Sequence, residues 1–293
     1  MDTLAQLARK LTDASLAHPI NPYAQVIEKF PAQLDMKQWF MPPELMSLYG
    51  TPTYEMLSEE DRMRLSFLEL VNLFSFTLFG ERVQVEGLTR RLYRAEMNEV
   101  TPYLHFFLSE ENNHMTYFGS FCQKYAGKLY PPTALALAAT DREYAPGEED
   151  FLFFIKLLIF EEIGDPFNLA IAMDASMPPF LRDLNMAHHK DEARHLAFGR
   201  ELVKSLWKMH APGWGTTRTE GIRTYLNDYF VSSWWEFYNL AVYKDAGLTG
   251  NLFEMREAAF EDPGRRAQRQ KMSAGISKFL INTGILQTAA DVG

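Results

Sequence analysis

The spacing of its apolar residues is the feature that most constrains how this chain can fold. Apolar residues recur at intervals of three and four through most of the 293 residues, whereas alternating strand patterns and hairpin-turn signals are rare. We therefore predict an all-α protein. Long helices are expected over residues 59–93, 102–127, 147–174 and 178–210, and further helical stretches over 217–246 and 252–283.

The organisation along the chain predicts a single domain over residues 1–293. Prolines punctuate residues 1–57 after a short first helix, which indicates an irregular arm that wraps on the body. Residues 58–210 are expected to form a core bundle of four long helices, and residues 211–285 to form flanking helices. A short helix is also expected over Thr133–Thr140. No low-complexity segment or charge block divides the chain.

Composition excludes several classes of function. The chain has 29 Lys and Arg residues against 38 Asp and Glu residues, a net charge of -9, which argues against binding to nucleic acid or to an anionic membrane surface. Its one cysteine, Cys122, cannot form an intramolecular disulfide or a Cys-rich metal site, so a reducing cytoplasm is expected. No stretch approaches the roughly 18 apolar residues of a membrane span.

Two segments on separate predicted helices share the pattern acid-Glu-x-x-His. One is Glu110-Glu111-Asn112-Asn113-His114, and the other is Asp191-Glu192-Ala193-Arg194-His195. A Glu and a His three residues apart lie on one helical face, so both side chains can reach the same ion. One such pair arises often by chance, whereas two copies indicate a metal site. The preceding acids either orient the histidines by hydrogen bonds or lie on the surface.

The same polar residues interrupt apolar helical faces. Glu111 and His114 lie within an apolar stripe of their helix, and His188, Glu192 and His195 occupy consecutive positions of another stripe. An isolated buried carboxylate is costly unless it is paired or protonated. Several such residues on inner helix faces therefore predict a shared cation. The stripe favours His188 over its neighbour His189.

The remaining two long helices are each expected to contribute one carboxylate. Glu81 is the single ionisable residue of an apolar stripe that also contains Leu78 and Val85. It is favoured over Glu69, and over Glu86, whose helical neighbours include arginines and which is expected on the surface. On the third helix either Glu161 or Glu162 follows the apolar run of residues 151–160.

The spacing of these carboxylates suggests two similar halves. Glu81 and Glu111 lie 30 residues apart, and the third-helix glutamate lies 30 or 31 residues before Glu192. This is the pattern of ferritin-like bundles that bind two iron or manganese ions, in which two helices each give a Glu and two give Glu-x-x-His. Four carboxylates balance two divalent ions, and oxygen and imidazole ligands suit Fe or Mn.

With the additional His188, the sequence resembles the p-aminobenzoate N-oxygenase family of non-haem di-iron enzymes, in the order and approximate spacing of the site residues across residues 60–210. The family's spacing favours Glu161 over Glu162. The resemblance therefore implies seven metal ligands: Glu81, Glu111, His114, Glu161, His188, Glu192 and His195.

The resemblance also implies the chemistry. A pair of Fe ions, with Mn as an alternative, would react with O2 as co-substrate and oxidise an amine, expected to be aromatic, to a hydroxylamine or nitro compound. Electrons would come from an external reductase or ferredoxin, because the chain has no flavin or iron–sulfur motif, and a homodimer is compatible with the family. Two alternatives stay open: a di-iron hydroxylase or desaturase acting on C–H bonds, and a non-enzymatic ferritin-like metal-binding protein.

Overall fold

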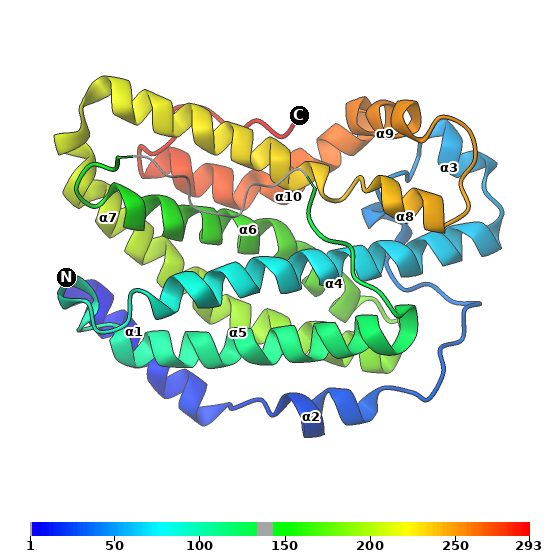
Figure 1. Ribbon diagram of the computed structural model, residues 1–293, viewed down its shortest axis with the longest axis horizontal. Coiled ribbons are helices and arrows are strands. Elements are labelled where there is room, and N and C mark those ends of the chain that lie inside the picture. The colour runs from blue at the N-terminus through cyan, green and yellow to red at the C-terminus, as the bar shows by residue number, and fades with distance from the viewer. Residues whose placement is uncertain (1, 134–142) are drawn as a thin grey trace.

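The computed structural model describes residues 2–133 and 143–293, and in these two ranges the secondary structure is entirely helical (Figure 1). This confirms the predicted all-α class. The helix expected over Thr133–Thr140 lies almost wholly outside the described residues.

Four long helices lie side by side and form the core bundle (Figure 1). They are α4 (Glu59–Thr89), α5 (Thr101–Phe121), α6 (Glu148–Met173) and the first part of α7 (Pro179–Trp235). Helix α4 packs mainly on α5, and α6 packs mainly on α7. Local signals set their starts: the Ser58 hydroxyl caps α4 by accepting the Asp61 N–H at 3.1 Å, and α6 begins with three acids that favour a helix N-terminus.

The fourth long helix differs from its prediction. It was expected to end near His210, but it continues through Pro212 and bends only at Gly215, whose φ of 74° and ψ of 165° are accessible to glycine. Trp214 explains the continuation, because its ring packs 5.5 Å from that of Phe151 and its Nε1–H donates to the Pro146 carbonyl at 3.0 Å. Docking on the start of α6 thus outweighs the one backbone hydrogen bond that Pro212 removes.

The flanking helices also differ in detail from the expected 217–246 and 252–283. The second part of α7 ends at Trp235, and a separate α8 (Leu240–Asp245) follows, because the Asn239 side chain accepts the Ala241 N–H and caps a new helix. The expected stretch over 252–283 is divided into α9 (Leu252–Glu261) and α10 (Pro263–Asn282), which meet at Pro263. Helix α10 packs on α6, opposite the side of the bundle that α5 occupies (Figure 1).

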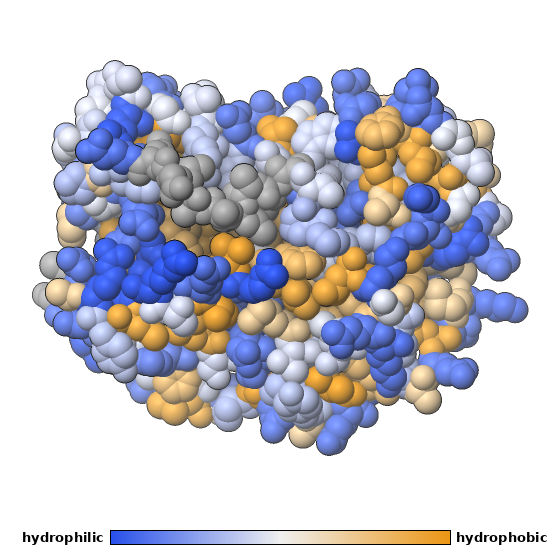
Figure 2. Space-filling model, in the orientation of Figure 1, coloured by the Kyte–Doolittle hydropathy of each residue, from blue (hydrophilic) through white to orange (hydrophobic). Residues whose placement is uncertain are grey.

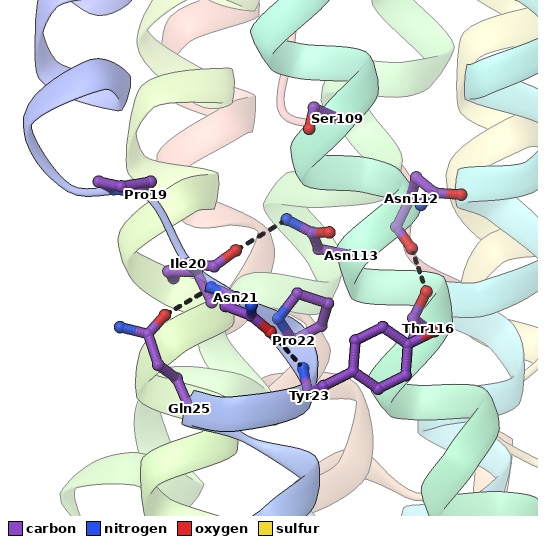
Figure 3. A pocket seen from close by; sticks show the side chains of 10 residues that line it. All are labelled: Pro19, Ile20, Asn21, Pro22, Tyr23, Gln25, Ser109, Asn112, Asn113 and Thr116. Carbon is purple, nitrogen blue, oxygen red and sulfur yellow. Dashed lines mark hydrogen bonds between the residues drawn. The ribbon is translucent and has the colours of Figure 1, made fainter.

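The first part of the N-terminal arm covers the α5 side of the bundle, and its last part lies near α8 and α9 (Figure 1). Helix α1 (Asp2–Ala17) packs on α5 and α7, and the chain then continues through α2 (Pro22–Gln25), short 3-10 turns over Ile27–Lys29 and Pro43–Leu45, and α3 (Pro52–Met56). A further 3-10 turn, Ala95–Met97, joins α4 to α5, and a π turn over Cys122–Ala126 ends α5. Figure 3 shows the arm against α5, where the Asn113 amide donates to the Ile20 carbonyl at 3.1 Å.

Among the described residues, one helix, α4, is long and apolar enough to pass a test for a membrane span, but 78% of its apolar window is buried inside the structure. This is the behaviour of a central bundle helix. Polar and apolar side chains are interspersed over the face shown in Figure 2.

Candidate metal centre

The seven residues predicted as metal ligands lie deep inside the bundle, on four different helices. Helix α4 provides Glu81, α5 provides Glu111 and His114, α6 provides Glu161, and α7 provides His188, Glu192 and His195. Each is at most 2% exposed. The apolar stripes that flank them drive the helices together and bury these polar side chains with the core.

One group of four residues brings two carboxylates and two imidazoles together. Nδ1 of His114 lies 3.4 Å from Glu81 Oε1 and 3.3 Å from Glu192 Oε1. Nε2 of His188 lies 3.3 Å from Glu81 Oε1 and 3.2 Å from Glu192 Oε1. One donor atom from each of the four lies within 4.8 Å of the others, so a single ion can contact them all.

A second group shares Glu192 with the first and adds Glu111 and His195. Nδ1 of His195 lies 2.9 Å from Glu111 Oε1, although the two atoms are not oriented as a hydrogen bond, and 3.3 Å from Glu192 Oε1. Because Glu192 belongs to both groups, its carboxylate is placed to bridge two ions. The geometry therefore offers two adjacent positions.

Glu161 lies beside these groups, and its neighbour Glu162 points elsewhere. Burial and the nearby Glu192 and Glu111 carboxylates raise the pKa of Glu161 well above its usual value, as expected of a carboxylate that lacks a cation. Glu162 instead accepts a hydrogen bond of 2.5 Å from Arg200 Nε. The structure thus brings Glu161 to the cluster, while its role as a ligand stays a prediction.

The donor atoms of the cluster fit a pair of divalent metal ions. Several are buried without a hydrogen-bond partner: Glu81 Oε2, both Glu111 carboxylate oxygens, Glu192 Oε2 and His114 Nδ1. Unpaired buried acceptors are costly, and a cation satisfies them. Four carboxylates and three neutral imidazoles match the charge of two divalent ions and the oxygen and nitrogen preference of Fe and Mn.

The pKa values of the cluster residues are shifted by their mutual electrostatic interactions. Burial disfavours the charged form of Glu192, yet His195 and His188 outweigh it and hold the pKa of this carboxyl well below its usual value. Burial likewise opposes charging of His114 and His195, but the surrounding carboxylates raise the pKa of both imidazoles well above the usual value. The buried carboxylates and imidazoles of the cluster thus favour each other's charged forms.

The acids that precede the two Glu-x-x-His motifs lie in a second layer, where each bonds the histidine of the other motif. His114 Nε2 is hydrogen-bonded to Asp191 at 3.2 Å, and His195 Nε2 to Glu110 at 2.8 Å. The Arg194 guanidinium donates to both acids. Of the two interpretations left open by the sequence, the orienting one is therefore correct. Each acid holds the Nε2 proton, which leaves Nδ1 of each imidazole free to face the carboxylates.

The other candidates considered from the sequence lie away from the cluster. Glu86 forms an exposed ion pair with Arg90 at 2.6 Å, and Glu69 is buried but bonded to Ser47. His189 is hydrogen-bonded to Asp165 at 2.7 Å, outside the cluster. Cys122 is a buried free thiol.

Sequence reasoning missed two residues next to the cluster. Arg194 lies inside one of the motifs, but nothing in its position signals that it joins two acids from different helices. Gln84 lies one turn after Glu81 and is 4% exposed, whereas Val85, which the predicted stripe placed on the buried face, is only half-buried. A polar residue three positions after a candidate ligand was the available signal for Gln84.

Residues 2–284 match the family described as P-aminobenzoate N-oxygenase AurF. Among solved structures, two variants of an R2-like ligand-binding oxidase with an aerobically reconstituted Mn/Fe cofactor are similar at 15% identity. One covers 92% of this chain and 93% of its own with a TM-score of 0.47, and the other covers 92% of both with a TM-score of 0.45. No curated protein matches significantly. Because the family match spans nearly the whole sequence, the chain belongs to the p-aminobenzoate N-oxygenase family of dimetal oxygenases.

Proposed function

We propose that this protein is a dimetal oxygenase that uses O2 to oxidise the nitrogen of an aromatic amine to a hydroxylamine or nitro group. The observation that carries the proposal is the buried cluster with unpaired donor atoms, found in a member of an N-oxygenase family. Glu81, His114 and His188 would hold one ion, Glu111, Glu161 and His195 would hold the other, and Glu192 would bridge them.

When bound, two Fe ions, or Mn in place of Fe, would supply the electron-transfer chemistry of O2 activation. The chain's own residues orient the metal-binding side chains and enclose the site. Asp191 and Glu110 keep a proton on Nε2 of His114 and His195, so that each imidazole presents its Nδ1 lone pair. The Phe107 ring stacks on His195 with centroids 3.9 Å apart and helps to exclude bulk water.

Several further properties belong to the same proposal. The reaction needs electrons from outside the chain, because the sequence has one cysteine and no flavin motif. A reductase or ferredoxin would donate them. We propose one functional domain over residues 1–293, a cytoplasmic location, a small-molecule substrate rather than nucleic acid or membrane, and a homodimer. The lone, buried Cys122 supports the reducing compartment.

The test is an isotope experiment on the reconstituted protein. The chain is loaded with Fe(II) without oxygen, mixed with a panel of aromatic amines, and exposed to 18O2. We expect hydroxylamine or nitro products whose new oxygen carries the label, as measured by mass spectrometry. Label that comes only from water, or oxidation confined to C–H bonds, would contradict N-oxygenation. Binding of many irons per chain instead of about two would indicate storage.

A further inference from the structure

Helices α4 and α6 approach each other closely beside the cluster. The Phe160 ring lies directly against Gly80, so that a Cβ on this glycine would collide with the ring. Gly80 directly precedes Glu81 on α4, and Phe160 directly precedes Glu161 on α6. The missing side chain at position 80 therefore lets two carboxylate-bearing segments come together, and a side chain one turn further along α4 can reach α6.

Gln84 is the side chain that reaches across. It lies one turn after Gly80, is 4% exposed, and its Nε2 donates a hydrogen bond to Glu161 Oε1. An ionised carboxylate only accepts hydrogen bonds, so the amide nitrogen is the atom that faces it. Two other buried amides of bundle helices, Asn168 and Asn185, donate instead to backbone carbonyls of their own helices, at 3.3 and 2.8 Å. Gln84 thus differs from them in holding a cluster carboxylate on another helix.

The two halves of the cluster are unequal at this point. Glu81 and Glu161 occupy corresponding places on α4 and α6, but the residue three positions later is Gln84 on α4 and Gly164 on α6. Gly164 has no side chain that could donate to Glu81, and Glu81 Oε2 is buried without a hydrogen-bond partner. Of these two carboxylates, only Glu161 accepts a hydrogen bond from an amide side chain of the described residues.

A hydrogen bond to one oxygen restricts how a carboxylate binds an ion. A carboxylate can give a metal ion one oxygen or both. An amide N–H on one oxygen competes for its lone pairs and fixes the orientation of the group. With Gln84 on Oε1, Glu161 therefore presents Oε2. The ion beside Glu111 and His195 would then have one protein donor fewer than if Glu161 bound it through both oxygens.

We propose that Gln84 is a positioning residue that holds Glu161 as a one-oxygen ligand and so keeps a coordination position free for a small ligand on the ion beside Glu111 and His195. The inference rests on the proposed function for the presence of that ion and for Glu161 in its ligand set. Gln84 acts through Glu161 and makes no contact with the ion itself. Its effect is confined to one of the two positions, because Glu81 has no equivalent partner.

Azide binding and Mössbauer spectroscopy of the iron-loaded protein test the proposal. Azide is a small anion that binds Fe(III) at a free coordination position, and the charge-transfer absorption of its complex with the O2-oxidised protein gives its affinity. Mössbauer spectra of the anaerobic Fe(II) protein report on each iron. The variant is Gln84→Met, which keeps the length of the side chain but cannot donate. Asn168→Met is the matched control, because Asn168 is a buried amide that bonds its own helix.

We expect a selective change in Gln84→Met. The variant should retain about two irons per chain, because Glu161 still binds. It should bind azide about tenfold more weakly, because the released oxygen of Glu161 competes for the same position. The Mössbauer doublet of one iron should change and that of the other should not. Asn168→Met should match the wild type in iron content, azide affinity and spectra.

Several results would overturn the role of Gln84. They are unchanged azide affinity or loss of iron in Gln84→Met, altered doublets of both irons, and equal changes in Asn168→Met. Failure of azide to bind the oxidised wild type also overturns it, and this measurement does not depend on the folding of a variant. The expected pattern without oxidation of any amine under O2 would leave the role of Gln84 standing and refute the proposed function.

Discussion

Two buried glutamates on helix α4 have very different surroundings. Glu69 is 5% exposed and Glu81 is 0% exposed. Both oxygens of Glu69 accept hydrogen bonds from Ser47, one from its N–H at 2.9 Å and one from its hydroxyl at 2.6 Å. Glu81 instead faces His114 and His188 through one oxygen, and its other oxygen has no partner.

The difference separates a structural carboxylate from one placed for a metal ion. A buried carboxylate whose two oxygens accept hydrogen bonds needs a cation less than one that has an unpaired oxygen among other carboxylates. Burial alone therefore does not identify a ligand. The unpaired oxygen of Glu81 among other carboxylates and imidazoles supports its predicted role as a ligand.

The largest effect is expected from the carboxylate shared by both groups. Glu192→Gln removes one charge from both metal positions, so iron bound after anaerobic reconstitution should fall from about two per chain to well below one. Glu69→Gln, the matched buried glutamate, should retain about two. Metal analysis of both variants measures the iron bound per chain. Equal iron loss in the two variants would contradict the distinction between a cluster glutamate and a structural one.

A second prediction separates adjacent histidines on α7. His188 faces Glu81 and Glu192, whereas His189 bonds Asp165 outside the cluster. His188→Asn should therefore weaken only the first position and leave roughly one tightly bound iron per chain, while His189→Asn should keep both. The iron content and the iron spectra of the two variants measure how many positions are occupied. Full occupancy and wild-type spectra in His188→Asn would remove this residue from the ligand set.

The smallest effect concerns the pH dependence of Glu69. Burial raises its pKa from 4.5 to about 7, against the hydrogen bonds from Ser47. Between these values the folded protein keeps a proton that the unfolded chain has released, so the free energy of unfolding falls as pH rises from about 4.5 to 7, by about 3 kcal/mol. The Glu69→Gln variant has no titratable group at this position, so its free energy of unfolding should not show this decrease. Urea unfolding of both proteins at pH 5 and pH 8 should show the difference, and parallel pH profiles would contradict it.

Local sequence patterns were sufficient to predict the bundle and to select the buried polar residues. Apolar stripes at helical spacing identify the four long helices, and polar residues that interrupt a stripe identify Glu81, Glu111 and His114 as buried. The Glu161 and Glu162 choice needed the family's spacing, because both follow the same apolar run. Their different partners appear only in the folded chain.

What the sequence could not reveal depends on contacts between distant segments. Helix α7 passes Pro212 because Trp214 docks on the start of α6, a contact that no local pattern encodes. The crossed bonds of Glu110 and Asp191, joined by Arg194, likewise require α5 and α7 in their final register.

The most direct test of a shared dimetal centre is to measure the stoichiometry and the magnetic coupling of iron in the wild-type chain. Fe(II) is titrated into the metal-free protein without oxygen, and bound iron is followed by metal analysis and Mössbauer spectroscopy before and after O2 is admitted. We expect about two irons per chain, which oxidise together as one magnetically coupled pair. Saturation at one iron, or two irons that oxidise independently, would contradict a shared centre bridged by Glu192.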